Sequence, residues 1–163
     1  MDFDTQAKLT LQTARQNGFT IATAESCTGG LIAAALTEIP GSSDVVDRGY
    51  VTYSNQAKID MLGIGVATLE RHGAVSEEIA AEMAQGALTR SGAGIAVSVT
   101  GIAGPGGSEH KPEGRVCFGI AHKMRATETQ TVEFGPLGRS NVRLETVKHA
   151  LYLLINSMIS QGD

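Results

Sequence analysis

A cluster of hydroxyl, thiol and glycine residues lies near the N-terminus, in the segment TIATAESCTGG at residues 20–30. Its apolar first half is typical of a buried strand, and the Ala- and Leu-rich run LIAAAL that begins just after it is typical of a helix. Ser26, Cys27 and Thr28 are therefore predicted to lie on a strand-to-helix turn. At such a turn, the free N–H groups and the positive dipole end of the helix face any anion or developing oxyanion in front of them.

Ser26 is a candidate nucleophile, which needs a base to remove its proton and donors to stabilise the resulting oxyanion. The backbone N–H groups from Cys27 to Gly30 are candidate donors, and glycine lets a substrate approach the backbone closely. Cys27 is a rival nucleophile near the same dipole, although without a histidine partner a small buried hydrophobe is the favoured interpretation. The alternative for Ser26 and Thr28 is a simple helix cap, which the local pattern supports at least as well.

A lysine is a better candidate for the base than a histidine. The stretch VTYSNQAK at residues 51–58 places Tyr53 at a strand end and Lys58 about one and a half helical turns into the next segment, at the same sheet edge. Lys58 must be neutral to accept a proton, which requires burial or a nearby cation. Taken alone, a lysine is more often solvated and a tyrosine more often a core aromatic. The histidines are scattered, and none is predicted to face the turn: His72, His110, His122 and His149.

Other glycine-rich and basic patterns are weaker signals. The loop from Gly101 to Gly107 lacks both the GK[ST] ending of a P-loop and the spacing GxGxxG. Arg139 and Arg143, near the start of the last predicted helix, suit a phosphate or carboxylate, or else exposure with a modest salt bridge. No His, Cys and carboxylate cluster has metal-ligand spacing, so neither a metal nor a cofactor is expected.

Helices and strands alternate along the chain, and their order predicts the fold. We expect a three-layer α/β/α sandwich with a mixed, mostly parallel sheet of about five strands. Ligands bind beyond the carboxyl ends of parallel strands in such sheets, so the turns after the strands ending near Ala24 and Thr100 both qualify. The predicted helices are 5–17, 29–38, a short one from 55, 76–90 and about 140–158, and the predicted strands are 21–24, 45–53, 95–100, 115–122 and about 129–134.

Composition indicates one globular domain over residues 1–163, with 42% hydrophobic and 18% charged residues. The net charge of −4 and the absence of a Lys/Arg stripe argue against nucleic acid as a partner. The apolar stretches are too short for a membrane span. Cys27 and Cys117 cannot make a disulfide framework, and the polar start MDFDTQAK is unlike a signal peptide, so a cytoplasmic protein is expected.

Four motifs follow one another along the chain: TAESCTGGLIAAALTEIPGSS, RGYVTYSNQAK, HGAVSEEIAAEMAQGAL and VSVTGIAGPGGSEHKPEG. Together they resemble the CinA C-terminal domain family. The resemblance covers nearly the whole chain and fits the stand-alone form of the family. Its characterised enzymes are nicotinamide mononucleotide deamidases, so the resemblance implies hydrolysis of that carboxamide to nicotinic acid mononucleotide and ammonia, in pyridine nucleotide recycling.

Carried over by motif, the resemblance implies Ser26 as the nucleophile and Tyr53 and Lys58 as proton-transfer partners, with the working base left open between the last two. It also implies an arginine near the last helix. Arg139 fits best, with Arg143 as the alternative because GPLGRSNVR differs from the GDR pattern of some members. The substrate-binding residues expected are Thr28, Gly29, Gly30, Thr100, Gly101 and Arg139.

Two other functional classes remain as alternatives. One is a nucleotide-binding regulatory module that keeps the pocket without catalysis. The other is an interaction partner in DNA uptake or damage responses, which the family name suggests and the acidic charge argues against. The Ala-rich helices and the long apolar C-terminal helix would also suit a homodimer.

Overall fold

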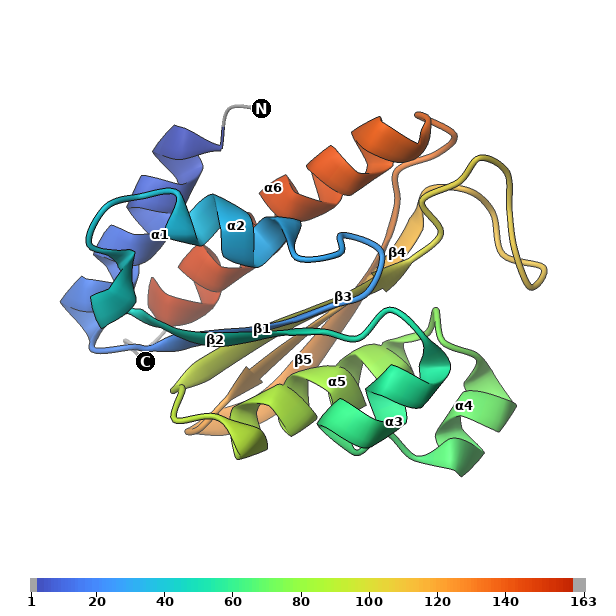
Figure 1. Ribbon diagram of the computed structural model, residues 1–163, viewed down its shortest axis with the longest axis horizontal. Helices are drawn as coiled ribbons and strands as arrows, with labels where there is room; N and C mark the ends of the chain where they lie inside the picture. The colour runs from blue at the N-terminus through green and yellow to red at the C-terminus, as the bar shows by residue number, and fades with distance from the viewer. Residues whose placement is uncertain (1–2, 160–163) are drawn as a thin grey trace.

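A five-stranded sheet between two layers of helices organises the computed structural model, which describes residues 3–159 (Figure 1). One face carries α1 (Asp4–Asn17), α2 (Leu31–Thr37) and α6 (Arg139–Ile159). The other face carries α3 (Asn55–Leu62), α4 (Val66–His72) and α5 (Glu77–Arg90). The strands are β1 (Ile21–Glu25), β2 (Val46–Val51), β3 (Ile95–Gly101), β4 (Arg115–His122) and β5 (Arg125–Glu133), and a short 3₁₀ helix, η1 (Ser42–Asp44), precedes β2.

The sheet is mixed, with strand order β2-β1-β3-β4-β5. β1 pairs in parallel with both β2 and β3, whereas β4 pairs antiparallel with β3 and β5, so four of the five strands run in one direction. The predicted three-layer sandwich with a five-stranded mixed sheet is therefore confirmed. In the register of the central pair, Glu25 lies opposite Val99, which brings the turn after β1 beside the end of β3. This edge is the predicted ligand site of an open sheet.

The two central strands are short apolar runs because helices cover both of their faces. All five residues of β1 are buried, as are the first six of β3. Larger side chains such as Leu11, Phe118 and Leu151 fill the layer towards α1 and α6. The layer towards α5 is built largely from alanines, among them Ala22 and Ala96. Small side chains let α5 approach the sheet closely, since interiors pack to near-crystalline density.

α6 brings basic side chains to the carboxyl edge of the sheet. Its buried residues, among them Val147 and Leu154, lie on one side of the helix, and α6 packs on α1 and the sheet. Its first residue is Arg139, and Arg143 follows one turn later. Although α6 has 21 residues, no helix within residues 3–159 is both long and apolar enough to cross a membrane.

Two elements differ most from the sequence-based expectation. α4 has no predicted counterpart, because none of its residues is buried and no apolar stripe marks it. β5 begins at Arg125, four residues before the expected start at 129, and most of its residues are exposed because it is an edge strand. A strand with little buried surface lacks the alternation that reveals strands in sequence.

Gly119 on β4 shows how closely α5 approaches the sheet. A Cβ at this position would lie 2.5 Å from the Ala80 carbonyl oxygen of α5 and 2.6 Å from Ser98 Oγ. The same carbonyl accepts a 2.5 Å hydrogen bond from the Ser98 hydroxyl, so neither atom can move away without breaking it. Glycine is therefore required at this contact.

We expect Gly119→Ala to lower the free energy of unfolding by about 1–3 kcal/mol, the usual range for overpacking a core. The matched control is Gly92→Ala, where a Cβ would meet nothing closer than 4.0 Å, with an expected change within about 0.5 kcal/mol. Urea denaturation of both variants measures the difference. Equal stabilities would contradict the close approach of α5 to β4.

Candidate active site

A cavity of about 200 Å³ opens at the carboxyl ends of β1 and β3. Figure 1 shows the connection from β1 to α2, the start of α3 and the loop after β3 gathered at this end of the sheet. Four separate chain segments and the start of α6 thus contribute to one site. The lining residues are Ser26, Cys27, Tyr53, Asn55, Lys58, Ala74, Val75, Thr100, Gly101, Ile102, Ala103, Ser108, Glu109 and Arg139.

Ser26 and Lys58 meet inside this cavity. Ser26 directly follows β1, and Lys58 lies on α3, whose first turn is capped by the Ser54 hydroxyl accepting from the Ala57 N–H at 3.0 Å. The Lys58 side chain is only 1% exposed, and its Nζ lies 3.0 Å from Ser26 Oγ. A nucleophile and a base within hydrogen-bond reach of each other are the minimum arrangement for covalent catalysis.

The surroundings of Lys58 suit a neutral amine. Burial lowers the pKa of Lys58 from its ordinary value. Its Nζ donates to the carbonyl oxygens of Thr52 at 2.9 Å and Tyr53 at 3.2 Å, and within residues 3–159 no carboxylate oxygen lies within 4.0 Å to hold a positive charge. A neutral amine has two N–H bonds and one lone pair. With the two carbonyls taking the N–H bonds, the lone pair is left for the Ser26 hydroxyl proton.

Cys27, the rival nucleophile, is a buried thiol. Burial, together with the charge of Glu25, raises the pKa of Cys27 to about 12 and outweighs the lowering effects of its own backbone N–H, Arg143 and Lys58. The thiolate is the reactive form of cysteine, and a thiol with so high a pKa remains protonated near neutral pH. The electrostatics therefore favour Ser26 over Cys27.

The N-terminus of α2 is occupied by a buried carboxylate, not by open space. Glu25, which is 1% exposed, accepts hydrogen bonds from the N–H groups of Ile32 at 2.8 Å and Ala33 at 3.0 Å. It also accepts from the Thr28 hydroxyl at 2.6 Å. The expectation that this helix end faces a substrate anion is wrong, because Glu25 already neutralises the free donors and the dipole.

Thr28, Gly29 and Gly30 are not among the residues that line the cavity. The two glycines take left-handed φ angles of 59° and 107°, so their role is to let the backbone turn sharply behind Ser26. The Gly29 N–H donates to the Ser26 carbonyl at 3.0 Å and is therefore not available to an oxyanion. By contrast, the Cys27 N–H donates to no oxygen among residues 3–159, and Cys27 does line the cavity.

The two candidate arginines have different places. Arg139 lines the cavity, and its guanidinium donates to the Gly104 carbonyl at 2.7 Å and the Tyr53 hydroxyl at 2.8 Å. Arg143 lies behind residues 26–30, the turn after β1 that we call the nucleophile turn. Its Nε donates to the Cys27 carbonyl at 3.1 Å and its Nη2 to the Thr28 carbonyl at 3.2 Å. Only Arg139 is positioned to meet a substrate.

Tyr53 and Thr100 both line the cavity, with different partners from those expected. The Tyr53 side chain is 61% exposed, and its hydroxyl contacts Arg139, while only its main-chain carbonyl contacts Lys58. The phenol is thus not placed between Lys58 and Ser26. The Thr100 hydroxyl donates to the Ala74 carbonyl at 2.8 Å, which leaves its oxygen lone pairs to accept from a ligand.

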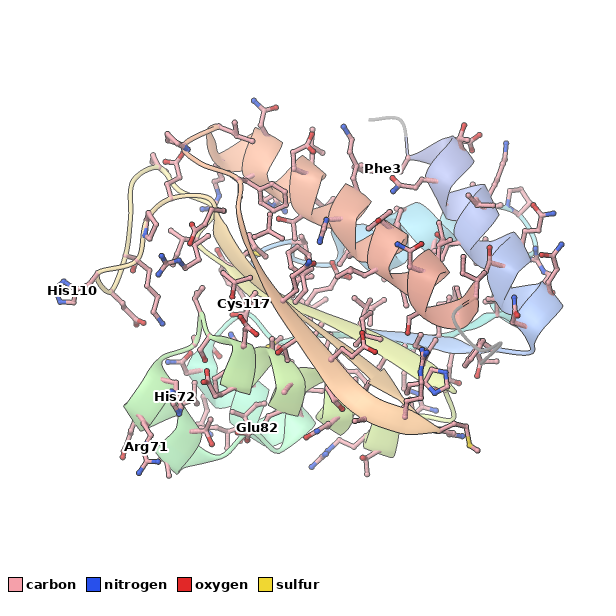
Figure 2. The ribbon with its side chains drawn as sticks, turned by 180° about the vertical axis from the view of Figure 1, so that it is seen from behind. Phe3, Arg71, His72, Glu82, His110 and Cys117 are labelled. Carbon is pink, nitrogen blue, oxygen red and sulfur yellow. The ribbon has the colours of Figure 1, made fainter. Side chains whose placement is uncertain are left out.

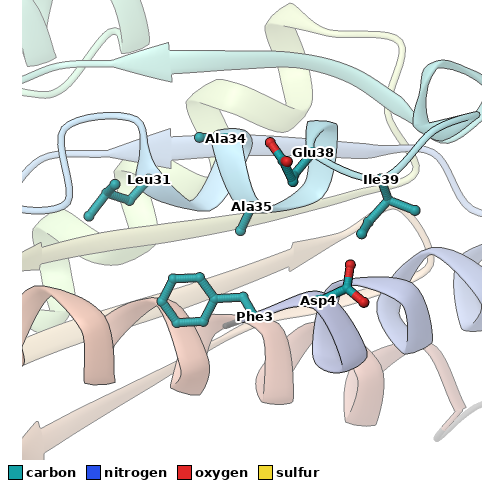
Figure 3. Close-up of a pocket in the computed structure, with 7 residues that line it drawn as sticks. All are labelled: Phe3, Asp4, Leu31, Ala34, Ala35, Glu38 and Ile39. Atoms are coloured by element: carbon teal, nitrogen blue, oxygen red, sulfur yellow. The ribbon is translucent and has the colours of Figure 1, made fainter. Parts of the chain in front are cut away.

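The histidines lie away from the cavity, as expected. Figure 2 shows His72 at the end of α4 and His110 at the tip of the loop after β3, and none of the four histidines is among the lining residues. A second hollow of about 310 Å³ lies between α1 and α2 (Figure 3). Its lining combines apolar side chains with two carboxylates and offers no nucleophile: Phe3, Asp4, Leu31, Ala34, Ala35, Glu38 and Ile39.

Some residues of the site were not singled out from the sequence. Glu25 had a usable signal, since a carboxylate just before a predicted helix start is a common capping arrangement. Asn55, Ser108 and Glu109 line the cavity from within the quoted motifs, at positions for which the sequence pattern offers no separate reason for selection. The carbonyl of Thr52 leaves no trace in the sequence, because every residue has one.

Known sequences similar to this chain carry PncC and CinA-like names. The chain is 49% identical over 146 residues to the nicotinamide-nucleotide amidohydrolase PncC of Enterobacter agglomerans, covering 89% of this chain and 88% of that protein. It is 62% identical over 106 residues to a CinA-like protein of Chlorobaculum tepidum, covering 64% of this chain. That relative is longer than this chain, and the match spans 25% of its length.

Solved structures show the same fold. The competence/damage inducible protein CihA of Agrobacterium tumefaciens superposes with a TM-score of 0.91 at 51% identity, covering 96% of this chain and 95% of the other. A CinA superfamily protein of Klebsiella pneumoniae gives a TM-score of 0.92 at 34% identity, covering 97% and 98%. The profile of the CinA C-terminal domain matches residues 4–158. The chain therefore belongs to the CinA C-terminal domain family.

Proposed function

We propose that this chain is an amidohydrolase that converts nicotinamide mononucleotide to nicotinic acid mononucleotide and ammonia. The observation that carries the proposal is the 3.0 Å contact between Ser26 Oγ and the buried Lys58 amine in an open cavity. The substrate follows from the similarity to PncC, which is named a nicotinamide-nucleotide amidohydrolase. Neither argument suffices alone, since a fold hosts many activities and a serine–lysine pair serves many substrates.

In the first step, Ser26 Oγ attacks the carboxamide carbon while its proton moves to the Lys58 amine. The two carbonyls that accept from Lys58 Nζ stabilise the ammonium so formed. The tetrahedral intermediate then loses its C–N bond, and Lys58 returns the proton to the departing nitrogen, which leaves as ammonia. An ester between Ser26 and the nicotinoyl group remains.

In the second step, water attacks the ester carbon and gives its proton to Lys58. The C–O bond to Ser26 breaks, the serine regains the proton, and the carboxylic acid product leaves and loses its remaining proton to water. In both steps the negative oxygen of the tetrahedral intermediate needs a donor. The Cys27 N–H is the donor we assign, because it follows the nucleophile directly and has no other oxygen partner among residues 3–159.

Substrate recognition is assigned to Thr100, Gly101 and Arg139, which line the cavity. The free lone pairs of the Thr100 hydroxyl accept from the carboxamide N–H₂ group. The guanidinium of Arg139 binds the phosphate, for which its planar fork is well shaped. Tyr53 supports this arginine through its hydroxyl instead of transferring protons.

We also propose that the partner of this chain is a small molecule and not nucleic acid, and that the chain acts in the cytoplasm as a homodimer. Binding of nicotinamide mononucleotide without ammonia release would favour a regulatory module instead. Salt-sensitive binding of duplex DNA would favour the interaction protein.

Replacing the nucleophile gives the first functional prediction. We expect Ser26→Ala to reduce ammonia release from nicotinamide mononucleotide to background, because among residues 3–159 the Ser26 hydroxyl alone is hydrogen-bonded to Lys58 Nζ. Ser43→Ala is the matched control, since Ser43 is exposed on η1, distant from the cavity, and should leave the rate unchanged. Near-normal turnover by Ser26→Ala would remove Ser26 from the mechanism.

The protonation state of Lys58 gives a pH prediction. Only the neutral amine accepts a proton, and burial lowers the pKa of Lys58, so the neutral fraction at a given pH is larger than for an ordinary lysine. We expect kcat/KM to rise with pH and to level off above a midpoint that lies below 10.5. Lys58→Arg, whose guanidinium stays protonated, should abolish this rise together with most of the activity. An unchanged profile in Lys58→Arg would exclude Lys58 as the base.

The assignment of Arg139 is tested with two substrates that differ only in the phosphate. We expect Arg139→Gln to raise KM for nicotinamide mononucleotide at least about tenfold, and to change KM for nicotinamide riboside little, because a charge-assisted contact to phosphate is lost. Arg71→Gln, on the outer helix α4, serves as control. Steady-state kinetics measures KM for both substrates. An equal rise in the two KM values would show that Arg139 does not recognise the phosphate.

A further inference from the structure

The turn after β1 contains consecutive peptide groups whose carbonyls are all held from behind. In a trans peptide the C=O and the following N–H point in opposite directions, so fixing a carbonyl also aims the N–H of the next residue. The Ser26 carbonyl accepts from the Gly29 N–H, and the carbonyls of Cys27 and Thr28 accept from Arg143. Three successive peptides are thus oriented by these contacts.

These contacts follow one another from Arg143 to the peptide that faces the cavity, and we call this series of hydrogen bonds the relay. Arg143 Nη2 holds the Thr28 carbonyl, so the N–H of the same peptide, that of Gly29, is turned towards the Ser26 carbonyl. The Gly29 N–H in turn holds the Ser26 carbonyl at 3.0 Å, so the Cys27 N–H points the other way. Cys27 is the residue of this turn that lines the cavity together with Ser26.

The turn needs such a hold because its backbone is permissive. A flip of the peptide between Thr28 and Gly29 changes ψ of the first residue and φ of the second, and glycine accepts either sign of φ at little cost. Gly29 has a φ of 59°, and Gly30 follows at 107°. The Thr28 carbonyl also accepts from the Leu31 N–H at 3.1 Å, so Arg143 is a second donor that holds this peptide. A flipped peptide would break both contacts and remove the donor that fixes the Ser26 carbonyl.

The guanidinium of Arg143 suits this task better than any other side chain. Nε and Nη2 reach the adjacent carbonyls of Cys27 and Thr28 at 3.1 Å and 3.2 Å, a two-pronged contact from one planar group. An amine at this place is a compact charge without the rigid fork that spans two carbonyls. Arg143 is also absent from the cavity lining, so it acts on the turn and not on a ligand.

We propose that Arg143 is a positioning residue that aims the Cys27 N–H at the developing oxyanion of the reaction, through the Thr28–Gly29 peptide. The inference rests on the proposed function for its reaction, but the relay itself applies to any electrophile that Ser26 attacks. Arg143 thus contributes to the rate without touching the substrate. Arg139, by contrast, contributes to binding.

The test compares Arg143→Lys with Arg15→Lys. Arg15 is a matched control, since it also donates to a main-chain carbonyl, that of Gly41 at 2.9 Å, but lies at the end of α1 on another part of the fold. We expect Arg143→Lys to lower kcat for nicotinamide mononucleotide about 100-fold, as for loss of an oxyanion donor, with little change in KM. Arg15→Lys should keep the wild-type kcat. Thermal denaturation verifies that both variants are folded.

A second measurement separates this inference from the choice of substrate. A fluorophosphonate reacts with Ser26 when Oγ attacks phosphorus, the proton passes to Lys58 and fluoride leaves, and the phosphoryl oxygen uses the same N–H donor. We expect labelling of Arg143→Lys to slow by a similar factor, whether or not the wild-type protein hydrolyses nicotinamide mononucleotide. Slowed labelling without wild-type deamidation would support the relay and contradict the proposed substrate.

The contrary outcomes are equally distinct. Wild-type kcat and labelling rate in Arg143→Lys, with deamidation intact, would overturn the relay and leave the proposed function standing. Wild-type labelling as slow as that of Ser26→Ala would overturn the oxyanion site itself. Should Arg143→Lys fail to fold, Arg143→Ala with added methylguanidinium takes its place. Recovery of kcat in Arg143→Ala by methylguanidinium supports the relay, and no recovery in a folded protein contradicts it.

Discussion

The burial of the Lys58 amine against two main-chain carbonyls and the Ser26 hydroxyl is the interaction on which the site depends. The amine lies at 2.9 Å and 3.2 Å from the carbonyls of Thr52 and Tyr53, and at 3.0 Å from Ser26 Oγ. Burying a charged amine without a carboxylate is costly, and that cost favours the neutral base. The sheet supports this contact by aligning the ends of β1 and β2, because Ser26 directly follows β1 and the two carbonyls directly follow β2.

The nucleophile turn is held from two sides by residues that face away from the cavity. Glu25 neutralises the start of α2 and fixes the Thr28 hydroxyl, while Arg143 from α6 fixes two carbonyls of the same turn. The helix dipole is thus used to stabilise the fold and not to bind a ligand. In the proposed mechanism, the oxyanion is bound by a main-chain N–H whose direction depends on its neighbours, and this couples catalysis to the packing of α6.

Much of the fold could be predicted from the sequence because its central strands are short apolar runs between recognisable turns and helices. β5 and α4 were harder, since exposed elements bury too little surface to leave a pattern. Within the site, the residue types indicated Ser26 and Lys58 as candidates. They did not indicate which atoms each side chain would be hydrogen-bonded to. The three-dimensional structure is needed to show that the Tyr53 hydroxyl is hydrogen-bonded to Arg139 and that the Gly29 N–H donates to the Ser26 carbonyl. Main-chain donors and acceptors, which decide these roles, are the same in every residue.

The central claim is that burial lowers the pKa of Lys58 and so favours the neutral amine as the base, and its titration tests that claim most directly. Carbon-13 NMR of lysine labelled at Cε, with Lys58→Arg to assign the resonance, follows the amine of the folded protein. The account predicts a midpoint below the ordinary lysine value of 10.5. A Lys58 midpoint at or above that value would mean that the amine stays charged, and would contradict the mechanism.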